Sequence, residues 1–275
     1  MVTPARSQQQ LAADFLALHR SGQPLLMPNP YDAGSARVLA ASGFSALATT
    51  SSGFAATMGR RDHKVTREEA LSGSASIVAA VDVPVSADLE NGFADDPAQV
   101  AATISGALEA GLAGCSIEDA TGRRDQPLYE PALAAERIAA AAEAAHTGPV
   151  HLVLTARAEG FLFPNPDLGD VIRRLQSFQE AGADVLFAPG ITDLATIKTV
   201  VSEVDRPVNV LVLPGSPTIA VLAAAGVARI SVGGTFTWVA LGAVRAAAEQ
   251  LQKGSYGFFD AAAGGREIVT QAFAD

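Results

Sequence analysis

The segment Ser86-Ala87-Asp88-Leu89-Glu90-Asn91-Gly92 follows a short apolar run and carries two carboxylates separated by one residue. A helical stretch from 97 to 110 comes next, and a second apolar run then leads into Cys115-Ser116-Ile117-Glu118-Asp119. This order is typical of a strand–helix–strand unit with parallel strands. Because side chains alternate along a strand, Asp88 and Glu90 are predicted to point the same way. Acidic residues therefore stand where two neighbouring strands end.

The same alternation continues along the whole chain of 275 residues. After an opening helix at 8–19, apolar strand candidates lie at 25–27, 46–49, 83–87, 114–117, 150–155, 185–188, 208–212 and 229–232. Helical patterns separate them near 33–42, 66–80, 97–110, 131–146, 169–181, 192–204, 217–225 and 237–252. Eight repeats predict an α/β fold, a (β/α)₈ TIM barrel forming a single domain over 1–275, with 253–275 as a C-terminal helical extension. A doubly wound sheet is the alternative, but Pro28-Asn29-Pro30-Tyr31-Asp32 is not its usual glycine-rich turn.

The amino-acid composition limits which binding partners and which cellular location we expect for the protein. Hydrophobic residues make up 49% of the chain, which is enough for a sizeable core. The net charge of −10 argues against nucleic acid as a partner, because nucleic acid requires a basic face. The single cysteine favours a reducing, cytoplasmic location, and no apolar run approaches the length of a membrane span.

The acidic strand ends predict a metal site. In a barrel of this kind the active site lies at the carboxyl ends of the strands. Carboxylates from two strands would repel each other there unless a cation lies among them, and Mg²⁺ is the simplest hard ion for oxygen ligands. Asp88, Glu90 and Glu118 are the candidate ligands.

Other polar residues are expected at the same face. Thr49-Thr50-Ser51-Ser52-Gly53 could grip an anion with its hydroxyls and amides, or could be a simple turn. Asp62 adds a carboxylate, and Arg157 could clamp an anionic substrate or serve as a structural partner of Glu118 or Glu159. Cys115 is predicted to face the helices as a buried, inert thiol, and His63 is the only histidine expected near the site. No two histidines show zinc-ligand spacing in the sequence.

The ordered motifs at 28–32, 49–53, 59–62, 87–92, 116–119 and 155–157 resemble those of the isocitrate lyase/phosphoenolpyruvate mutase superfamily. The resemblance covers about residues 24–245 and implies a barrel whose eighth helix is exchanged between subunits of a homo-oligomer, a dimer or tetramer. It implies Mg²⁺, or Mn²⁺ in its place, and a small 2-oxo or 2-hydroxy (di)carboxylate. By this resemblance Asp88 is the direct metal ligand and also faces the substrate, Glu90 and Glu118 hold metal-bound waters, and Asp62 is an active-site carboxylate. The implied substrate-binding residues are Tyr31, Thr50, Ser51, Ser52, Gly53, Asp88 and Arg157.

The chain departs from that family at the mobile loop after the fourth strand. The lyases carry a Lys-Lys/Arg-Cys-Gly-His segment there, whereas this loop reads Ala120-Thr121-Gly122-Arg123-Arg124-Asp125-Gln126-Pro127-Leu128 and has no cysteine. Arg123 and Asp125 are therefore the candidates for the missing catalytic groups. The favoured function is a Mg²⁺-dependent lyase that breaks a carbon–carbon bond by aldol-type cleavage or decarboxylation through an enolate. The alternatives are phosphorus–carbon chemistry, as in a mutase or hydrolase, and a non-catalytic 2-oxo-acid-binding protein.

Overall fold

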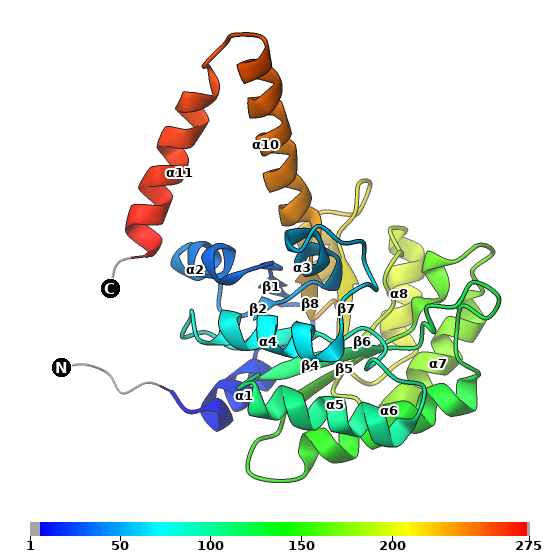
Figure 1. Cartoon of the computed structure of the whole chain (residues 1–275). Helices are drawn as coiled ribbons and strands as arrows, with labels where there is room; N and C mark the ends of the chain where they lie inside the picture. The colour runs from blue at the N-terminus through cyan, green and yellow to red at the C-terminus, as the bar shows by residue number, and fades with distance from the viewer. Residues whose placement is uncertain (1–5, 274–275) are drawn as a thin grey trace.

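Eight parallel strands form a nearly closed barrel in the computed structural model, which describes residues 6–273 (Figure 1). The strands are β1 (Leu25–Met27), β2 (Leu47–Ala48), β3 (Val85–Asp88), β4 (Gly114–Glu118), β5 (Val153–Arg157), β6 (Val185–Phe187), β7 (Val208–Leu211) and β8 (Arg229–Ser231). They pair in the order β1-β8-β7-β6-β5-β4-β3-β2. The amide of Ala48 donates to the carbonyl of Pro28 at 3.1 Å and joins the two ends of this sheet. The predicted (β/α)₈ barrel is confirmed.

The helices surround the barrel, and most begin at a residue whose side chain caps the first turn. Thr66 and Glu69, for example, form a reciprocal capping box at the start of α4. The helices are α1 (Gln8–Ala17), α2 (Ala33–Ala41), α3 (Ser51–Thr57), α4 (Arg67–Val78), α5 (Pro97–Glu109), α6 (Pro131–His146), η1 (Glu159–Leu162, a 3₁₀ helix), α7 (Leu168–Glu180), α8 (Leu194–Ser202), α9 (Ile219–Ala224), α10 (Thr235–Gln252) and α11 (Phe258–Ala272).

Helix α3 is an element that the sequence pattern did not separate from a turn. Thr50 occupies its N-cap position, and its hydroxyl accepts a hydrogen bond from the amide of Gly53 at 3.4 Å. The segment is short and rich in Ser and Gly, which favour turns as much as helix starts. Its helical form directs the free amides of its first turn toward the carboxyl end of β3.

The apolar core lies between the outer faces of the strands and the helices. Cys115, Ile117 and Leu154 are fully buried there, which confirms that the thiol of Cys115 faces the helices. Burial raises the pKa of this thiol, so it stays protonated and unreactive. Helix α1 covers the amino end of the barrel, where the ring of Phe15 packs with Val153 and Val185. The opposite, carboxyl end is left free for the site.

A cluster of His146, His151 and Asp184, here called the clasp, connects α6, β5 and β6 at the amino end of the barrel. Nε2 of His146 and Nε2 of His151 each lie 3.0 Å from a carboxylate oxygen of Asp184, and the two rings stack 4.0 Å apart. The amide of Leu154 donates to the same carboxylate at 2.8 Å. Hydrogen bonds thus account for these three side chains, and the position of both histidines at the amino end agrees with the prediction that only His63 lies near the site.

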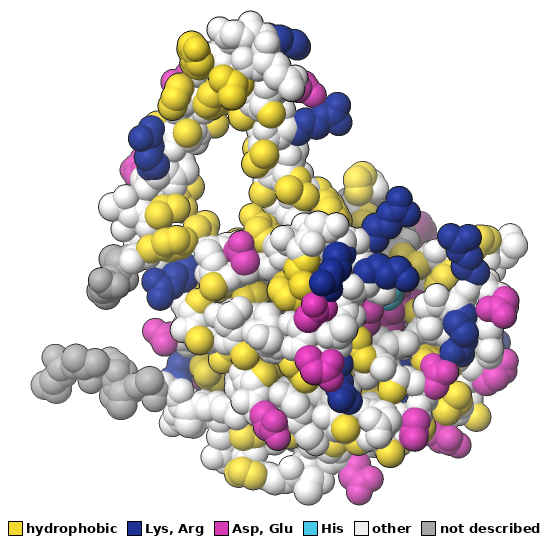
Figure 2. Space-filling view, viewed as in Figure 1, with side chains coloured by type: hydrophobic (Ala, Val, Ile, Leu, Met, Phe, Trp, Pro, Cys, Tyr) yellow, Lys and Arg dark blue, Asp and Glu magenta, His cyan; other side chains and the backbone are white. Residues whose placement is uncertain are grey.

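Helices α10 and α11 form an arm that projects from the barrel beside β8 (Figure 1). Thr237 is the only buried residue in α10, and α11 has none. Apolar side chains gather on both helices of the arm (Figure 2), and Val239 and Val244 are 64% and 67% exposed. The far end of α11 lies against α2, where Arg37 stands over the ring of Phe273 at 5.8 Å. Within residues 6–273, no helix has the length and apolar character needed to cross a membrane.

Candidate active site at the carboxyl end of the barrel

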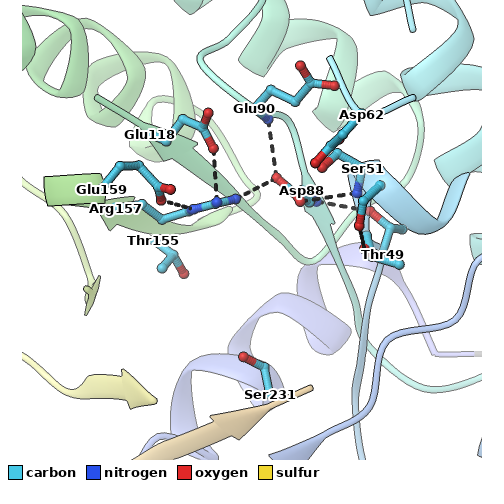
Figure 3. A network of polar contacts seen from close by, with 12 residues as sticks. Thr49, Ser51, Asp62, Asp88, Glu90, Glu118, Thr155, Arg157, Glu159 and Ser231 are labelled. Atoms are coloured by element: carbon cyan, nitrogen blue, oxygen red, sulfur yellow. Dashed lines mark hydrogen bonds and ion pairs between the residues drawn. The ribbon is translucent and has the colours of Figure 1, made fainter. Parts of the chain in front are cut away.

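Arg157 lies at the centre of a ring of carboxylates at the carboxyl end of the barrel (Figure 3). Its guanidinium donates to Asp88 on β3 at 2.8 Å and to Glu159 on η1 at 2.8 Å, and it forms an ion pair with Glu118 on β4 at 2.9 Å. The side chains of Glu118 and Glu159 are each only 4% exposed. The parallel pairing of β3, β4 and β5 brings these groups together, because their carboxyl ends meet at one rim.

The charges in this ring do not balance. One guanidinium faces the carboxylates of Asp88, Glu118 and Glu159, so the ionised cluster carries a formal charge of −2. Burial raises the pKa of Glu118 well above its usual value, against the opposing effect of Arg157. Burial also tends to raise the pKa of Asp88, but the charge of Arg157 and the donated amides of Ser51 and Glu90 outweigh it and hold that pKa below its usual value. An additional cation would therefore stabilise the ionised form of this ring.

Asp88 is held in place by the neighbouring strand and by α3. The amide of Ser51 donates to Oδ2 of Asp88 at 3.1 Å, and the amide of Asp88 itself donates to Oγ1 of Thr49 at 2.9 Å. A carboxylate near the first turn of a helix is also favoured by the partial positive charge of that helix end. The predicted cradle at 49–53 thus binds an anion in this structure, and that anion is the side chain of Asp88.

Glu90 is directed differently from Asp88, against the prediction from strand alternation. Strand β3 ends at Asp88, and Glu90 adopts a left-handed conformation with φ of 49°. Its carboxylate lies 3.0 Å from Nδ1 of His63, whose pKa rises to about 9 chiefly through this hydrogen bond. Burial raises the pKa of Glu90, although the hydrogen bond from His63 acts in the opposite direction. The alternation rule did not apply because the residue lies in the turn beyond the strand.

Gly53 lets α10 approach the cradle closely. A Cβ atom at this position would lie 2.5 Å from Oγ1 of Thr237 and 2.5 Å from Cγ2 of Thr50. The hydroxyls of Thr50 and Ser52 lie 3.2 Å apart at the same helix start. Tyr31 lines a narrow cleft beside this helix, next to Ser51 and Asp88. The residues predicted to bind substrate therefore cluster around α3, except for Arg157, which reaches Asp88 from β5.

A cavity of about 180 Å³, partly open to solvent, lies between the rim and the barrel interior. Thr50, Ser51, Ser52, Asp62, Asp88 and Arg157 line its upper part, together with Gly233 and Gly234. Its lower part reaches polar groups inside the barrel, namely Ser86, Ser116, Asn209, Arg229 and Ser231, whereas Asn29 lines it at the rim, just beyond the carboxyl end of β1. Asn209 and Arg229 were not among the site residues predicted from the sequence. Their only signal was a polar residue at a strand position where branched apolar residues are usual.

Arg123 and Asp125 lie outside this cavity. The loop that carries them is closed by a bridge between Ala120 and Leu128. Arg123 pairs with Asp95 at 2.7 Å and stands 5.6 Å from the centre of the Tyr129 ring. Asp125 is exposed on the same loop. In this conformation the loop contributes no group to the cavity wall.

The residues at the rim fit a divalent cation by charge and by chemistry. Asp88 and Glu118 offer hard oxygen donors, and the cluster of Asp88, Glu118 and Glu159 around Arg157 has two negative charges in excess. Within residues 6–273, the only three-residue group whose ligand atoms all lie within 4.8 Å of one another is the His146, His151 and Asp184 clasp at the other end of the barrel. The strand pattern predicted that Glu90 would join Asp88 and Glu118 as a metal ligand. In the structure its carboxylate pairs with His63 instead, and these three carboxylates do not form a compact ligand group.

Comparison with known proteins gives consistent matches over most of the chain. The family model described as phosphoenolpyruvate phosphomutase matches residues 15–252. A solved structure from Burkholderia cenocepacia J2315, described as a lyase/mutase without further assignment, is 50% identical, with a TM-score of 0.92, and the match covers 98% of this chain and 97% of that one. An uncharacterized protein of Mycobacterium tuberculosis is 34% identical over 80% of this chain and 81% of its own length. A 2-methylisocitrate lyase of Halalkalibacterium halodurans is 29% identical over 75% of this chain and 69% of its own length.

Proposed function

This chain belongs to the phosphoenolpyruvate phosphomutase family, and on that premise we propose that it is a Mg²⁺-dependent lyase acting on a small 2-oxo or 2-hydroxy carboxylate. The proposed reaction breaks a carbon–carbon bond at the carbon adjacent to the oxo or hydroxyl carbon, and the electron pair of that bond stays on this adjacent carbon as an enolate. The observation that supports it is the ring of Asp88, Glu118 and Glu159 around Arg157 above an open cavity. A site with both a surplus of carboxylates and a guanidinium can handle a metal ion and an anion together.

In this proposal the chain's own residues bind and orient the substrate. Arg157 donates to the substrate's carboxylate, because its planar guanidinium matches a carboxylate in bidentate fashion. The hydroxyls of Thr50 and Ser52, at the start of α3, line the same cavity and would contact the same anion. Asp62 lines the cavity near Asp88 and is the proposed acid/base group that takes or returns the proton (Figure 3).

The proposed metal ligands are Asp88 directly, with Glu118 and Glu90 through water. Mg²⁺, or Mn²⁺, would supply Lewis-acid stabilisation of the negative charge that develops on the substrate oxygen. Glu90 would have to give up part of its pairing with His63 to take this role.

Decarboxylation needs fewer acid/base groups than aldol-type cleavage, and it therefore suits this site better. When the carbon–carbon bond breaks, its electron pair passes into the enolate and carbon dioxide leaves, so only one proton has to be returned. Aldol-type cleavage also needs a base for the substrate hydroxyl. The loop at 120–128 is proposed as a lid, with Arg123 and Asp125 as its candidates for proton transfer after it leaves Asp95.

A direct assay distinguishes this proposal from its alternatives. The protein is incubated with Mg²⁺ and either oxaloacetate, 2-methylisocitrate or phosphonopyruvate, and pyruvate and inorganic phosphate are measured with Asp88→Asn as the inactive control. Pyruvate from either of the first two substrates, dependent on the metal, supports the lyase. Pyruvate with phosphate from phosphonopyruvate alone would identify phosphorus–carbon chemistry instead. Thermal stabilisation by 2-oxo acids with no product would identify a non-catalytic binding protein.

We also propose that a second copy of this chain covers the arm. Apolar side chains gather on the arm (Figure 2), and the exposed ones on α10 include Trp238, Val239, Leu241 and Val244. Helix α10 starts directly beside the cradle, where Thr237 approaches Gly53 closely. An apolar stripe of this extent is costly in water unless another surface buries it. The exchange of α10 and α11 within a homodimer or a tetramer would do so. The single buried thiol agrees with a cytoplasmic location, which fractionation of cells that express the protein would test.

A further inference from the structure

The interior of the barrel below Arg157 is polar where such barrels are normally filled by branched apolar side chains. Ser86 on β3, Ser116 on β4 and Ser231 on β8 line the lower part of the cavity, together with Asn209 on β7. These side chains are small or polar and leave open space toward the amino end of the barrel. The cavity continues down to Arg229 on β8, which forms part of its wall.

Arg229 is a buried cation without a negative partner. It is 3% exposed, and its Nε donates to Oδ1 of Asn209 at 2.9 Å and its Nη2 to Oγ1 of Thr155 at 3.1 Å. Nη1 lies 3.1 Å from Nε2 of His19, and burial lowers the pKa of His19 to about 3, so this ring is uncharged at neutral pH. Among the residues that the structure describes, no carboxylate lies within 4.0 Å of this guanidinium.

Of the other three arginines with buried guanidinium groups, two pair with carboxylates, and the third, Arg137, lies away from the cavity. Arg157 has its three carboxylates, and Arg174 pairs with Asp119 at 3.2 Å and with Asp170 at 2.7 Å. Arg137 donates to main-chain carbonyls and lies 3.9 Å from the centre of the Tyr129 ring. A buried charge without such partners is costly. Arg229 differs from these three in combining a neutral surrounding with an open cavity, which is the arrangement expected of a site for an anion.

The spacing suits one ligand that reaches both guanidinium groups. Arg229 contacts Thr155, and Thr155 and Arg157 are two residues apart on β5, on the same face of the strand. Their Cα atoms are therefore about 6.6 Å apart along the strand. An acid bound by Arg157 at one end could place a second anionic group near Arg229.

We propose that Arg229, with Asn209 and Ser231, forms a second anion subsite that binds the far carboxylate of a 2-oxo dicarboxylate. The inference rests on the proposed function, because it assumes that the 2-oxo end of the ligand binds at the rim. In this proposal, the residues deep inside the barrel give the protein its preference for dicarboxylates over monocarboxylates.

The test compares acids of equal chain length that differ only in the far group. 2-Oxoglutarate is paired with 2-oxopentanoate, and 2-oxoadipate with 2-oxohexanoate, because neither dicarboxylate carries its far carboxylate where the proposed reaction would remove it, and the dissociation constants are measured by calorimetry with Mg²⁺ present. We expect the intact protein to bind the dicarboxylate of at least one pair about 10- to 100-fold more tightly, the range expected for hydrogen bonds to a charged group. Arg229→Gln should abolish this preference and leave the affinity for the monocarboxylate unchanged, and Arg229→Lys should retain part of it.

Two further variants distinguish a loss of dicarboxylate binding from a general loss of stability. Arg137→Gln removes another buried guanidinium, outside the cavity, and should lower the melting temperature without changing the preference. Ser231→Val fills the subsite with a methyl group and should weaken only the dicarboxylate, so the proposal stays testable if Arg229→Gln does not fold.

Equal affinities within both pairs in the intact protein would overturn the subsite, and so would an Arg229→Gln variant that loses both acids of a pair equally. If the intact protein binds the monocarboxylates alone, the proposed function stands and only the subsite is wrong. Failure to bind any of the four acids would contradict the proposed function, and the subsite with it.

Discussion

Arg157 on β5 donates to the carboxylate of Asp88 on β3 across the carboxyl end of the barrel, at 2.8 Å. The two strands are not neighbours, because β4 lies between them. This ion pair therefore connects the predicted metal ligand directly to the predicted substrate clamp. A metal ion and a substrate bound here, as proposed, would share the charge of one cluster with this guanidinium.

Arg157→Met keeps the length of the side chain and removes its charge. We expect it to lower the free energy of unfolding by about 3–5 kcal/mol, because the three buried carboxylates lose the cation that pairs with all of them. Mg²⁺ should then raise the melting temperature of the variant by more than that of the intact protein, as measured by scanning fluorimetry. The control is Arg173→Met, which removes an exposed pair with Asp170 and should cost less than about 1 kcal/mol. Equal shifts with Mg²⁺ in the variant and the intact protein would contradict the charge argument.

Gly53→Ala tests the close approach of α3 and α10. The added methyl group would collide with Thr50 and Thr237, so we expect a loss of about 1–3 kcal/mol from overpacking, measured by urea unfolding. Gly242→Ala is the matched control within α10, since its Cβ would meet no atom within 4 Å. There the change should be neutral or stabilising by up to about 1 kcal/mol. A Gly53→Ala variant as stable as the control would mean that the two helices are not packed as described.

Asp184→Asn tests the clasp at the amino end of the barrel. Burial tends to raise the pKa of Asp184, but the hydrogen bonds from His146, the Leu154 amide and His151 outweigh it, so the pKa in the folded state lies below its usual value. A lowered pKa stabilises the fold above the unfolded-state pKa of about 4, and this contribution is lost as the pH falls through the lower, folded-state value. At pH 7 we expect the variant to lose about 1–3 kcal/mol.

The pH dependence supplies the decisive comparison for that variant. Urea unfolding between pH 7 and pH 3 should show the gap between Asp184→Asn and the intact protein narrowing at acid pH. Asp205→Asn, which alters an exposed carboxylate, should run parallel to the intact protein. A constant gap for Asp184→Asn would show that the ionised carboxylate does not stabilise the clasp.

The barrel and much of its rim could be predicted from the sequence, because each of the strands concerned is an apolar run that ends at a charged residue. Apolar runs that stop at Asp88, Glu118 and Arg157 place these side chains at one rim as soon as the strands are parallel. The burial of Cys115 followed from the same alternation. What the pattern could not give was the exact end of each strand, and this is why Glu90 was assigned to the face of Asp88 when it pairs with His63 in the following turn.

Long-range pairings were also beyond the sequence. Arg229 and His19 are 210 residues apart, and nothing local indicates that α1 covers the amino end of the barrel and brings them together. His146 and His151 meet Asp184 in the same way, through the ends of three different elements. The two helices of the arm were predicted, at 237–252 and within 253–275, but their projection from the barrel with exposed apolar side chains appears only in three dimensions.

Val244→Asp tests whether a second copy covers the arm. Val244 is 67% exposed in the single chain, so a charge there should cost a monomer little. Within an oligomer it would bury an unpaired carboxylate, and we expect the assembly to shift toward monomer in light scattering coupled to size exclusion. Glu249→Gln, a half-exposed polar position on the same helix, is the control. Identical oligomeric states for the intact protein and Val244→Asp would contradict the proposed exchange.

The central claim is that Asp88 and its neighbours hold a divalent ion that in turn binds a keto acid. The most direct test is calorimetric titration of the intact protein and of Asp88→Ala with Mg²⁺, followed by oxalate as a stable mimic of a 2-oxo-acid enolate. We expect the intact protein to bind Mg²⁺ and to bind oxalate only in its presence, and the variant to lose both while it stays folded. Unchanged binding of Mg²⁺ and of oxalate by Asp88→Ala would contradict this account.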